Sequence, residues 1–357
     1  MKTHYSSLLL LFLLFISGCS NDEPVKIDIY STTINVQGKV LVTSDRLIDP
    51  WTISCMDSLL VLANKKGEPL IEVYNTKGEL LKKLLKKGKG ASDIRMVGGL
   101  QRDLSKQRFY VGDLFDKKII MISVKNLLGQ KDYQASTFVD FKKLGASGDV
   151  LEKAYVLNNS FVGESSSPKG RIVLIDSSGK KLTYKLDFPK KVDPTLSDEE
   201  NVHLYSGTIK FSPNNKNLTF ATYNAGCLDC FDVKSTDIFP KWHYYDFFPN
   251  NLNRVKLDDK SYVAFSNKSV AGYPDVDATN KYVYALFSGK TFETTDYTFS
   301  NVIRVTSWDG KKRYKLILNR DINRLTVSQD DATIYGISKN IKGDPEIIAF
   351  DIKNLIK

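Results

Sequence analysis

Six copies of a two-strand pattern constrain the fold of this chain more than any other feature of its sequence. The first strands begin at Leu59, Arg108, Ser160, Leu218, Tyr282 and Thr333, and their starts lie 49, 52, 58, 64 and 51 residues apart. After a polar gap come the second strands: LIEVYNT from Leu70, IIMISVK from Ile119, RIVLIDS from Arg171, CLDCFDV from Cys227, VIRVTSW from Val302 and IIAFDIK from Ile347. Both sets are rich in β-branched and aromatic residues. Because the second set also alternates apolar with polar residues, we expect β-strands with one buried face.

Each copy has flanking segments that supply two more strands. A preceding segment ends in a turn, as in TISCMDS, GGLQRDLSK, TIKFSPNNK, PDVDATNK and RLTVSQDD. A fourth strand follows a glycine-containing turn in NTKGELLKKLL, DSSGKKLTYKLD and WDGKKRYKLIL. Glycine suits such hairpins because it adopts positive φ without strain. Four antiparallel strands per repeat predict an all-β protein, a six-bladed β-propeller over residues 26–357.

The sixth copy ends after its third strand, near Ile352. The stretch from Lys26 to Ser44 is β-patterned, as KIDIYSTTI and GKVLVTS, and we expect it to supply the missing outer strand. This N-terminal strand would close the ring and leave no long exposed edge. We expect no substantial helix, because residues 81–89 are too few and contain glycine. The segment from Ser197 to Val202 predicts one helical turn.

The N-terminus indicates export. Residues 8–16 are nine unbroken apolar residues after Lys2, too few to cross a bilayer, which needs about 20 in a helix. Ile16-Ser17-Gly18-Cys19 resembles the bacterial lipobox, which implies a signal peptide over residues 1–18 and a lipid, with palmitate-type acyl chains, on Cys19. The alternative is an ordinary signal peptide beside a coincidental cysteine. If Cys19 carries the lipid, residues 19–25 form a lipidated tether. Within it, Asp22-Glu23 resembles the export signal of surface lipoproteins in the Bacteroidetes. We expect anchoring at the bacterial outer membrane, on its periplasmic or cell-surface face.

From Val25 to Lys357 the chain resembles the TolB-like six-bladed propeller lipoproteins of Bacteroidetes, which are similar in shape to NHL propellers. The resemblance rests on the six repeats, on LIEVYNTKGEL and CLDCFDV, and on GKGASDI at residues 88–94. In the family a Gly-x-Gly-Pro-x-Glu-like turn often stands at this last position, whereas this chain has Ala91 and Asp93 in place of the proline and the glutamate. The resemblance implies an envelope propeller and no particular activity.

The charge of the chain says little about its partners. Without residues 1–18 it keeps 50 of 51 Lys+Arg and all 41 Asp+Glu, a formal charge of +9. The excess lysines come as doublets, mostly at turns, where they keep the protein soluble. The alternative is a weak attraction to anionic glycans or lipid headgroups. Because an exported chain does not meet nucleic acid, we expect no such partner.

Three cysteines remain besides Cys19: Cys55, Cys227 and Cys230. The Cys-x-x-Cys spacing suggests redox or zinc chemistry, but it lies in the strand-like CLDCFDV without a second pair or a nearby histidine. Residues three apart on a strand point to opposite faces. We therefore expect Cys227 and Cys230 to pack in the core, and a disulfide or a metal site stays an alternative.

Residues for catalysis are few. Only His203 and His243 remain after signal cleavage, and neither lies in a nucleophile motif. Asp275 and Asp277 lie on one strand face, either as a cation site or as a solvated strand end. We expect no catalytic, cofactor-binding or metal-binding residues and no cofactor. The alternative is a glycan-processing lyase or hydrolase that uses His203, Asp275 and Asp277 at the mouth of the propeller channel, with Arg95 as a charge stabiliser.

Ligand recognition is the function that the sequence favours. An aromatic cluster, FPKWHYYDFFPNN, falls in the expected outer strand of blade 4. It either packs against blade 5 or forms a strip that stacks on sugars or a partner protein. Long loops at 188–205, 248–273 and 288–301 place a site on the loop-rich face near blades 4 and 5. The candidate ligand-binding residues are Trp242, His243, Tyr244, Tyr205 and Arg95. We predict a binding or scaffolding module for a glycan, a peptide or an envelope protein.

Overall fold

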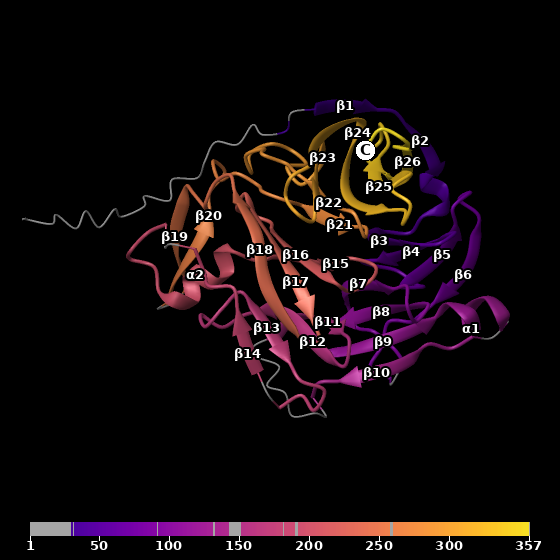
Figure 1. The fold of residues 1–357 in the computed structure, drawn as a ribbon, viewed down its shortest axis with the longest axis horizontal. Helices are drawn as coiled ribbons and strands as arrows, with labels where there is room; N and C mark the ends of the chain where they lie inside the picture. The colour runs from indigo at the N-terminus through magenta and orange to yellow at the C-terminus, as the bar shows by residue number, and fades with distance from the viewer. Residues whose placement is uncertain are drawn as a thin grey trace, which may run out of the picture.

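The computed structural model describes residue 30 and residues 32–356, apart from residues 91, 131–132, 143–150, 181, 190–191 and 258–259. The predicted signal peptide, Cys19 and the acidic pair Asp22-Glu23 lie outside the described residues. Over the described part, the repeats predicted from the sequence form strands arranged around a central axis (Figure 1).

Six antiparallel blades form the ring, and their innermost strands surround the axis (Figure 1). Blade 1 contains β3 (Pro50–Met56), β4 (Leu59–Asn64), β5 (Ile71–Asn75) and β6 (Leu80–Leu84), and blade 2 contains β7 (Val97–Asp103), β8 (Arg108–Asp113), β9 (Lys118–Ser123) and β10 (Ser136–Asp140). Blade 3 contains β11 (Leu151–Leu157), β12 (Ser160–Ser165), β13 (Ile172–Ile175) and β14 (Leu182–Lys185), and blade 4 contains β15 (Gly207–Phe211), β16 (Asn217–Thr222), β17 (Cys227–Lys234) and β18 (Asp237–Tyr245). Blade 5 contains β21 (Asp275–Ala278), β22 (Tyr282–Leu286), β23 (Ser300–Ser307) and the first part of β24 (Arg313–Val327). Blade 6 contains the second part of β24, β25 (Thr333–Lys339) and β26 (Pro345–Asp351). All twelve strands of the repeated pattern are confirmed.

The N-terminal segment closes the ring, as the sequence predicted. β2 (Gly38–Val42) pairs antiparallel with β26 and is the outer strand of blade 6. Of the two proposed donors, GKVLVTS is therefore the correct one. Two features were not predicted. β1 (Thr32–Val36) pairs parallel with β24 and gives blade 5 a fifth strand, and β24 itself runs from blade 5 into blade 6 without a break.

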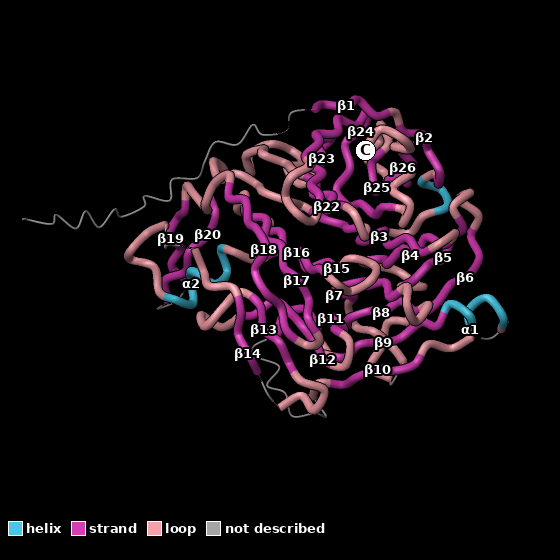
Figure 2. The backbone as a smooth tube through the Cα atoms, viewed as in Figure 1, coloured by secondary structure: helices cyan, strands magenta, loops and turns pink. Residues whose placement is uncertain are grey.

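The loops near blades 4 and 5 carry their own structure. α2 (Asp198–Leu204) lies between blades 3 and 4, where one helical turn was predicted, and Ser197 caps it in a capping box with Glu200. A hairpin, β19 (Leu252–Leu257) and β20 (Lys260–Phe265), lies between blades 4 and 5. The other helical segments are η1 (Ser44–Arg46) and α1 (Val124–Gly129) (Figure 2). No helix in the described ranges is long and apolar enough to cross a membrane.

Local residue choices agree with the blade architecture. Gly78, Gly179 and Gly310, the glycines of the predicted turns, have φ values of 81°, 74° and 73°. These angles strain any residue with a Cβ, which is why glycine occupies the turns. The apolar faces of adjacent blades pack against each other, and Val42 of β2 is buried between blades 6 and 1.

The cysteine pair behaves as the strand pattern predicted. Cys227 and Cys230 are free and buried, and they belong to two different apolar clusters. The Cys227 cluster contains residues that follow blade 3, and the Cys230 cluster contains residues of blade 5. The two sulfurs therefore lie on opposite faces of β17. Core packing is confirmed, and a disulfide between them is ruled out.

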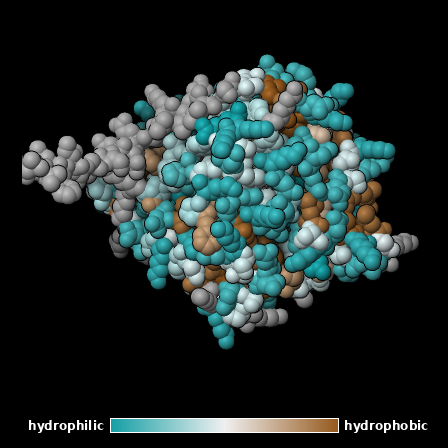
Figure 3. Space-filling model, in the orientation of Figure 1, coloured by the Kyte–Doolittle hydropathy of each residue, from teal (hydrophilic) through white to brown (hydrophobic). Residues whose placement is uncertain are grey.

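The face of the molecule seen in Figure 3 is mostly hydrophilic, with apolar residues visible in several places, among them the rim near β6. Leu80, Leu81 and Leu128 are 38%, 39% and 57% exposed there. Isolated exposed leucines are normal on soluble proteins, and three at one rim form only a small patch.

Candidate functional site

A cavity of about 320 Å³ opens at the end of the axis where the innermost strands begin. All six blades contribute to its lining, because Trp51, Gly98, Lys153, Thr208, Asp275 and Arg324 each stand within the first three residues of an inner strand or of the inner part of β24. Loops of blades 4 and 5 complete the rim through Tyr223, Asn224, Tyr297 and Thr298. The cavity thus lies on the loop-rich face, in the region where the loop lengths predicted a ligand site. That a ligand binds there stays a prediction.

A second hollow of about 570 Å³ lies beside the β19–β20 hairpin. Its lining comes only from residues 251–253 and 265–268, at the base of that hairpin. The axial cavity is the better candidate, because groups from separate blades converge on it.

Two consecutive glycines form the blade 2 wall of the axial cavity. Gly98 and Gly99 both line it, and a Cβ built on Gly99 would lie 3.4 Å from the ring of Tyr155, another lining residue. A larger side chain at Gly99 would therefore extend into the cavity. The strand pattern alone gives no reason for glycine here, since glycine weakens strand interiors.

Lys153 is held in place on the blade 3 side. Its Nζ donates to the Gly207 carbonyl at 3.1 Å and to the Tyr223 hydroxyl at 3.0 Å, and it lies 3.3 Å from a Glu164 carboxylate oxygen. Burial acts to lower the pKa of Lys153, but Tyr223 and Glu164 outweigh it and raise the pKa. Lys153 is therefore a charged, neutralised group that positions Tyr223 at the rim.

Lys210 and Arg324 flank Asp275 on the opposite wall. Asp275 accepts a hydrogen bond from the Leu325 amide at 2.9 Å. Burial raises the pKa of Asp275, while the charges of Lys210 and Arg324 act against this rise. The guanidinium of Arg324 lies 4.4 Å from the ring centre of Trp51 and donates to the Asn323 and Pro274 carbonyls. These contacts hold the guanidinium plane in one orientation.

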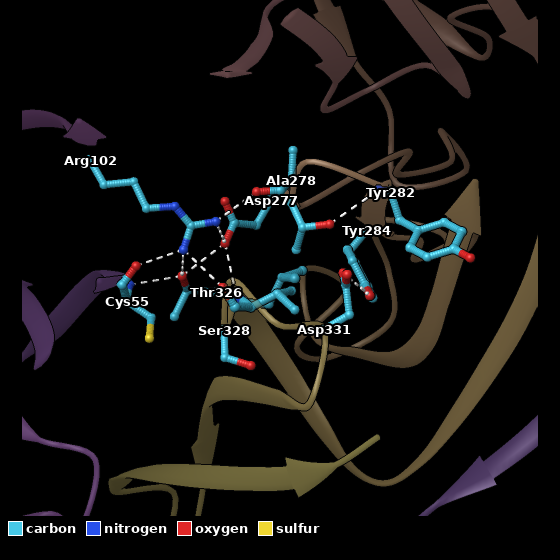
Figure 4. Close-up of polar contacts among 12 residues, drawn as sticks. Cys55, Arg102, Asp277, Ala278, Tyr282, Tyr284, Thr326, Ser328 and Asp331 are labelled. Atoms are coloured by element: carbon cyan, nitrogen blue, oxygen red, sulfur yellow. Dashed lines mark hydrogen bonds and ion pairs between the residues drawn. The ribbon is translucent and has the colours of Figure 1, made fainter. Parts of the chain in front are cut away.

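Arg102 lies below the axial cavity, where it lines a much smaller space next to Leu100, Tyr155 and Lys210. Its polar contacts are drawn in Figure 4. Its side chain reaches from β7 of blade 2 and is nearly buried. It donates to the carbonyls of Cys55, Val327 and Ala278, in blades 1, 6 and 5, and it forms an ion pair with Asp277 at 3.1 Å. Only about 10 Å³ of free space remains beside Arg102 and Asp277. The cavity is therefore a pocket closed below by a buried ion pair.

The two carboxylates of PDVDATN share one face, as predicted, but the solvated strand end expected for them is wrong. Asp275 and Asp277 are each 4% exposed. Asp277 accepts from the Thr326 hydroxyl and the Val327 amide, both at 2.8 Å, in addition to its pairing with Arg102. Burial is tolerated because each carboxylate finds donors on the inner strand of blade 6. The cation held at Asp277 is an arginine, and no cluster of three or more potential metal-ligating His, Cys, Asp or Glu side chains occurs among the described residues.

Trp242 and Tyr244 of the aromatic cluster pack against blade 5, as one of the two interpretations predicted. The Trp242 indole donates to the Trp308 carbonyl at 3.0 Å, and the Tyr244 hydroxyl donates to the Gly310 carbonyl at 3.2 Å. Both acceptors belong to blade 5. His243 points the other way, is exposed, and lies 4.9 Å from the Tyr245 ring.

None of the five candidate ligand-binding residues lines the axial cavity. Trp242, His243 and Tyr244 lie on β18. Tyr205 is buried at the end of α2, and its ring centre lies 5.8 Å from the guanidinium carbon of Arg171. Arg95 is partly exposed before β7 and pairs with Asp116 at 3.6 Å. His203 lies exposed on α2. Among the residues considered for a catalytic alternative, only Asp275 lines the cavity, and a ligand role for the other residues stays a prediction.

The sequence contained a signal for the residues that do converge. Trp51, Gly98 and Lys210 stand in TISCMDS, GGLQRDLSK and TIKFSPNNK or directly before them, and these are the first strands of their repeats. Aligning the first strands and reading their first residues would have selected the channel mouth. Arg102 could not have been found this way, because its partners lie up to 225 positions away.

The strand order, the ring closure and the axial pocket define a six-bladed β-propeller with one pocket at the mouth of its axis. The chain belongs to the TolB-like family: the family model described as TolB-like 6-blade propeller-like matches residues 30–330.

Two solved structures have a similar fold. One, from Bacteroides fragilis NCTC 9343, is described as an exported protein; it is 11% identical, with a TM-score of 0.51 over 89% of this chain and 99% of that one. The other is a member of the duf4221 family from Bacteroides vulgatus ATCC 8482; it is 10% identical, with a TM-score of 0.52 over 85% of this chain and 92% of that one. At these identities the likeness concerns the fold. Comparison with curated proteins finds no match.

Proposed function

We propose that this protein is an exported, lipid-anchored propeller that binds the end of a glycan chain in its axial pocket. The observation that carries the proposal is the pocket itself, in which groups from six blades converge around about 320 Å³. Small-molecule sites typically measure roughly 300–1,000 Å³. This pocket is at the lower end of that range, and it fits a sugar unit or two better than the surface of a folded protein.

The chemistry of the rim supports a sugar ligand. Thr52, Thr208, Asn224 and Thr298 offer hydroxyl and amide groups, and Tyr223 and Tyr297 add aromatic rings. Hydroxyl groups of a sugar need such donors and acceptors, while its apolar face packs on aromatic rings. The description of the Bacteroides fragilis structure as exported agrees with an envelope location.

Lipid anchoring is tested at Cys19. In cells of a bacterium with a lipoprotein pathway, we expect the wild-type chain to incorporate radiolabelled palmitate and to sediment with the outer membrane. Cys19→Ser should lose the label and leave the membrane fraction, because acyl chains supply about 0.8 kcal/mol per buried methylene. Retention of the C19S variant in the washed membrane would contradict anchoring through this cysteine. Protease accessibility in intact cells separates the periplasmic face from the cell-surface face.

Ligand binding is tested with a soluble chain that begins at Ser20, applied to an array of bacterial and plant oligosaccharides. We expect wild-type protein to bind at least one glycan class, and Gly99→Val to lower this affinity tenfold or more, because the added side chain enters the pocket. The substitution removes no polar group, and Gly99 lacks positive φ, so the strand should accept valine.

The matched control for that experiment is His243→Ala. It removes the exposed member of the β18 aromatic cluster, outside the pocket. We expect unchanged binding in this variant. Loss of binding in H243A together with normal binding in G99V would move the site to the β18 strip. Binding of envelope peptides in place of glycans would replace the ligand class, and release of shortened glycans would indicate catalysis.

A further inference from the structure

The axial pocket carries an excess of positive charge. Its charged lining residues are Lys153, Lys210, Arg324 and Asp275. Lys153 is neutralised by Glu164 at 3.3 Å. Two cations, Lys210 and Arg324, then share the single carboxylate of Asp275, which burial inclines towards its protonated form. The pocket therefore has a net charge of at least +1.

The two cations keep hydrogen-bonding capacity. The Lys210 ammonium group has no hydrogen-bond or ion-pair partner among the described residues, and its charge acts to lower the pKa of Asp275. Arg324 donates through Nη1 to two carbonyls at 2.7 and 3.3 Å, while its Nη2 and Nε have no acceptor in the described ranges. Both side chains are only partly buried, and their free N–H groups are not among the buried polar atoms that lack a partner. They are therefore open to an anionic ligand, which accepts charge-assisted hydrogen bonds from them.

The geometry favours a planar, singly charged anion. Arg324 is fixed by stacking at 4.4 Å on Trp51, and a guanidinium held in one plane matches a carboxylate, which accepts two parallel hydrogen bonds from it. One excess positive charge is balanced by one carboxylate. The neutral groups at the rim, Asn224 and Thr298 among them, remain for hydroxyl groups of the same ligand.

We infer that the pocket recognises an acidic sugar, with the carboxylate of a uronate unit between Lys210 and Arg324 and its hydroxyl groups at the rim. The inference rests on the proposed glycan-binding function and names the ligand class for that site.

The experiment compares two ligands with the same sugar chain, whose carboxyl groups are free and charged in one and methyl-esterified and neutral in the other. The chain beginning at Ser20 is titrated by calorimetry with trigalacturonate and with its fully methyl-esterified form, at pH 7 and low salt. We expect the acid to bind at least tenfold more tightly than the ester and to weaken as salt is added. Lys210→Met and Arg324→Gln should each lower the affinity for the acid tenfold or more, and leave the affinity for the ester within twofold.

The control variant is Lys353→Met. Lys353 is exposed and lies beside the turn between β24 and β25. This turn is at one end of the inner strand of blade 6, and the pocket is at the other end. The control variant should bind the acid like wild type, and circular dichroism is used to check that every variant is folded. Arg324→Lys keeps the positive charge but lacks the planar guanidinium that gives two parallel hydrogen bonds. Its affinity for the acid should therefore lie between those of wild type and Arg324→Gln.

The outcomes separate the two proposals. Equal affinity for acid and ester, with both lost in G99V, would overturn the acidic-sugar inference and leave glycan binding in place. Tighter binding of a sulfated trisaccharide than of trigalacturonate, or no binding of the acid at millimolar concentration, would also overturn the inference. The glycan array then decides the proposed function by itself.

Discussion

Replacing Arg102 by methionine should lower the free energy of unfolding by about 3–5 kcal/mol, because it leaves a buried carboxylate without its cation. Asp277 would keep two hydrogen bonds from blade 6, while the carbonyls of Cys55, Ala278 and Val327 would lose a donor. Methionine approximates the length of the arginine stem, so most of the loss reflects polar groups. Urea unfolding followed by circular dichroism measures it.

Two further variants make this expectation specific. Lys106 lies just beyond the end of β7, and its partly exposed ammonium group is 4.0 Å from the Asp103 carboxylate. Lys106→Met should lower the free energy of unfolding by less than about 0.5 kcal/mol. The double variant Arg102→Met/Asp277→Asn should be more stable than R102M alone, since the amide oxygen still accepts from Val327 without an unpaired charge. A cost below about 1 kcal/mol for R102M would mean that the ion pair does not hold the inner strands together.

Removal of the N-terminal clasp, the strands β1 and β2, is expected to abolish cooperative folding. A chain that begins at Ser44 loses the outer strand of blade 6 and the added strand of blade 5, together with the buried side chains of Val36 and Val42. Burial of a valine contributes about 1.5–3 kcal/mol, and the lost hydrogen bonds leave open strand edges prone to association. Total stabilities of about 5–15 kcal/mol leave little margin for such losses.

Scanning calorimetry and size-exclusion chromatography test the clasp. The chain beginning at Ser20 should unfold in one transition, whereas the truncated chain should aggregate or unfold without one. Within the intact chain, Val42→Ala should cost about 2 kcal/mol, and Val40→Ala, 44% exposed on the same strand, should cost under about 0.5 kcal/mol. An unchanged melting temperature after truncation would show that the ring does not need its clasp.

Much of the fold was accessible from local patterns. Gly78, Gly179 and Gly310 indicated hairpin turns, because these turns need a residue with positive φ and glycine adopts positive φ without strain. Each of the three glycines has a positive φ in the structure. The three-residue spacing of Cys227 and Cys230 separated the sulfurs because strand side chains alternate. Both arguments use contacts within one strand or one turn.

The parallel pairing of β1 on blade 5 was not accessible in this way. Thr32 pairs with Tyr314, and a five-residue segment carries no local sign of which distant edge it joins. The same holds for Asp275 and Asp277. A period of two placed them on one face, but nothing nearby in the chain showed that this face turns to the axis and to blade 6.

The sequence by itself determined the number of blades, the place of the turns and the closing of the last blade by the N-terminus, because strand periodicity and turn chemistry act over a few residues. The tertiary structure decided which side chains meet at the axis. Lys210, Arg324 and Asp275 come from three different blades, and only the closed ring brings the beginnings of those strands to one pocket.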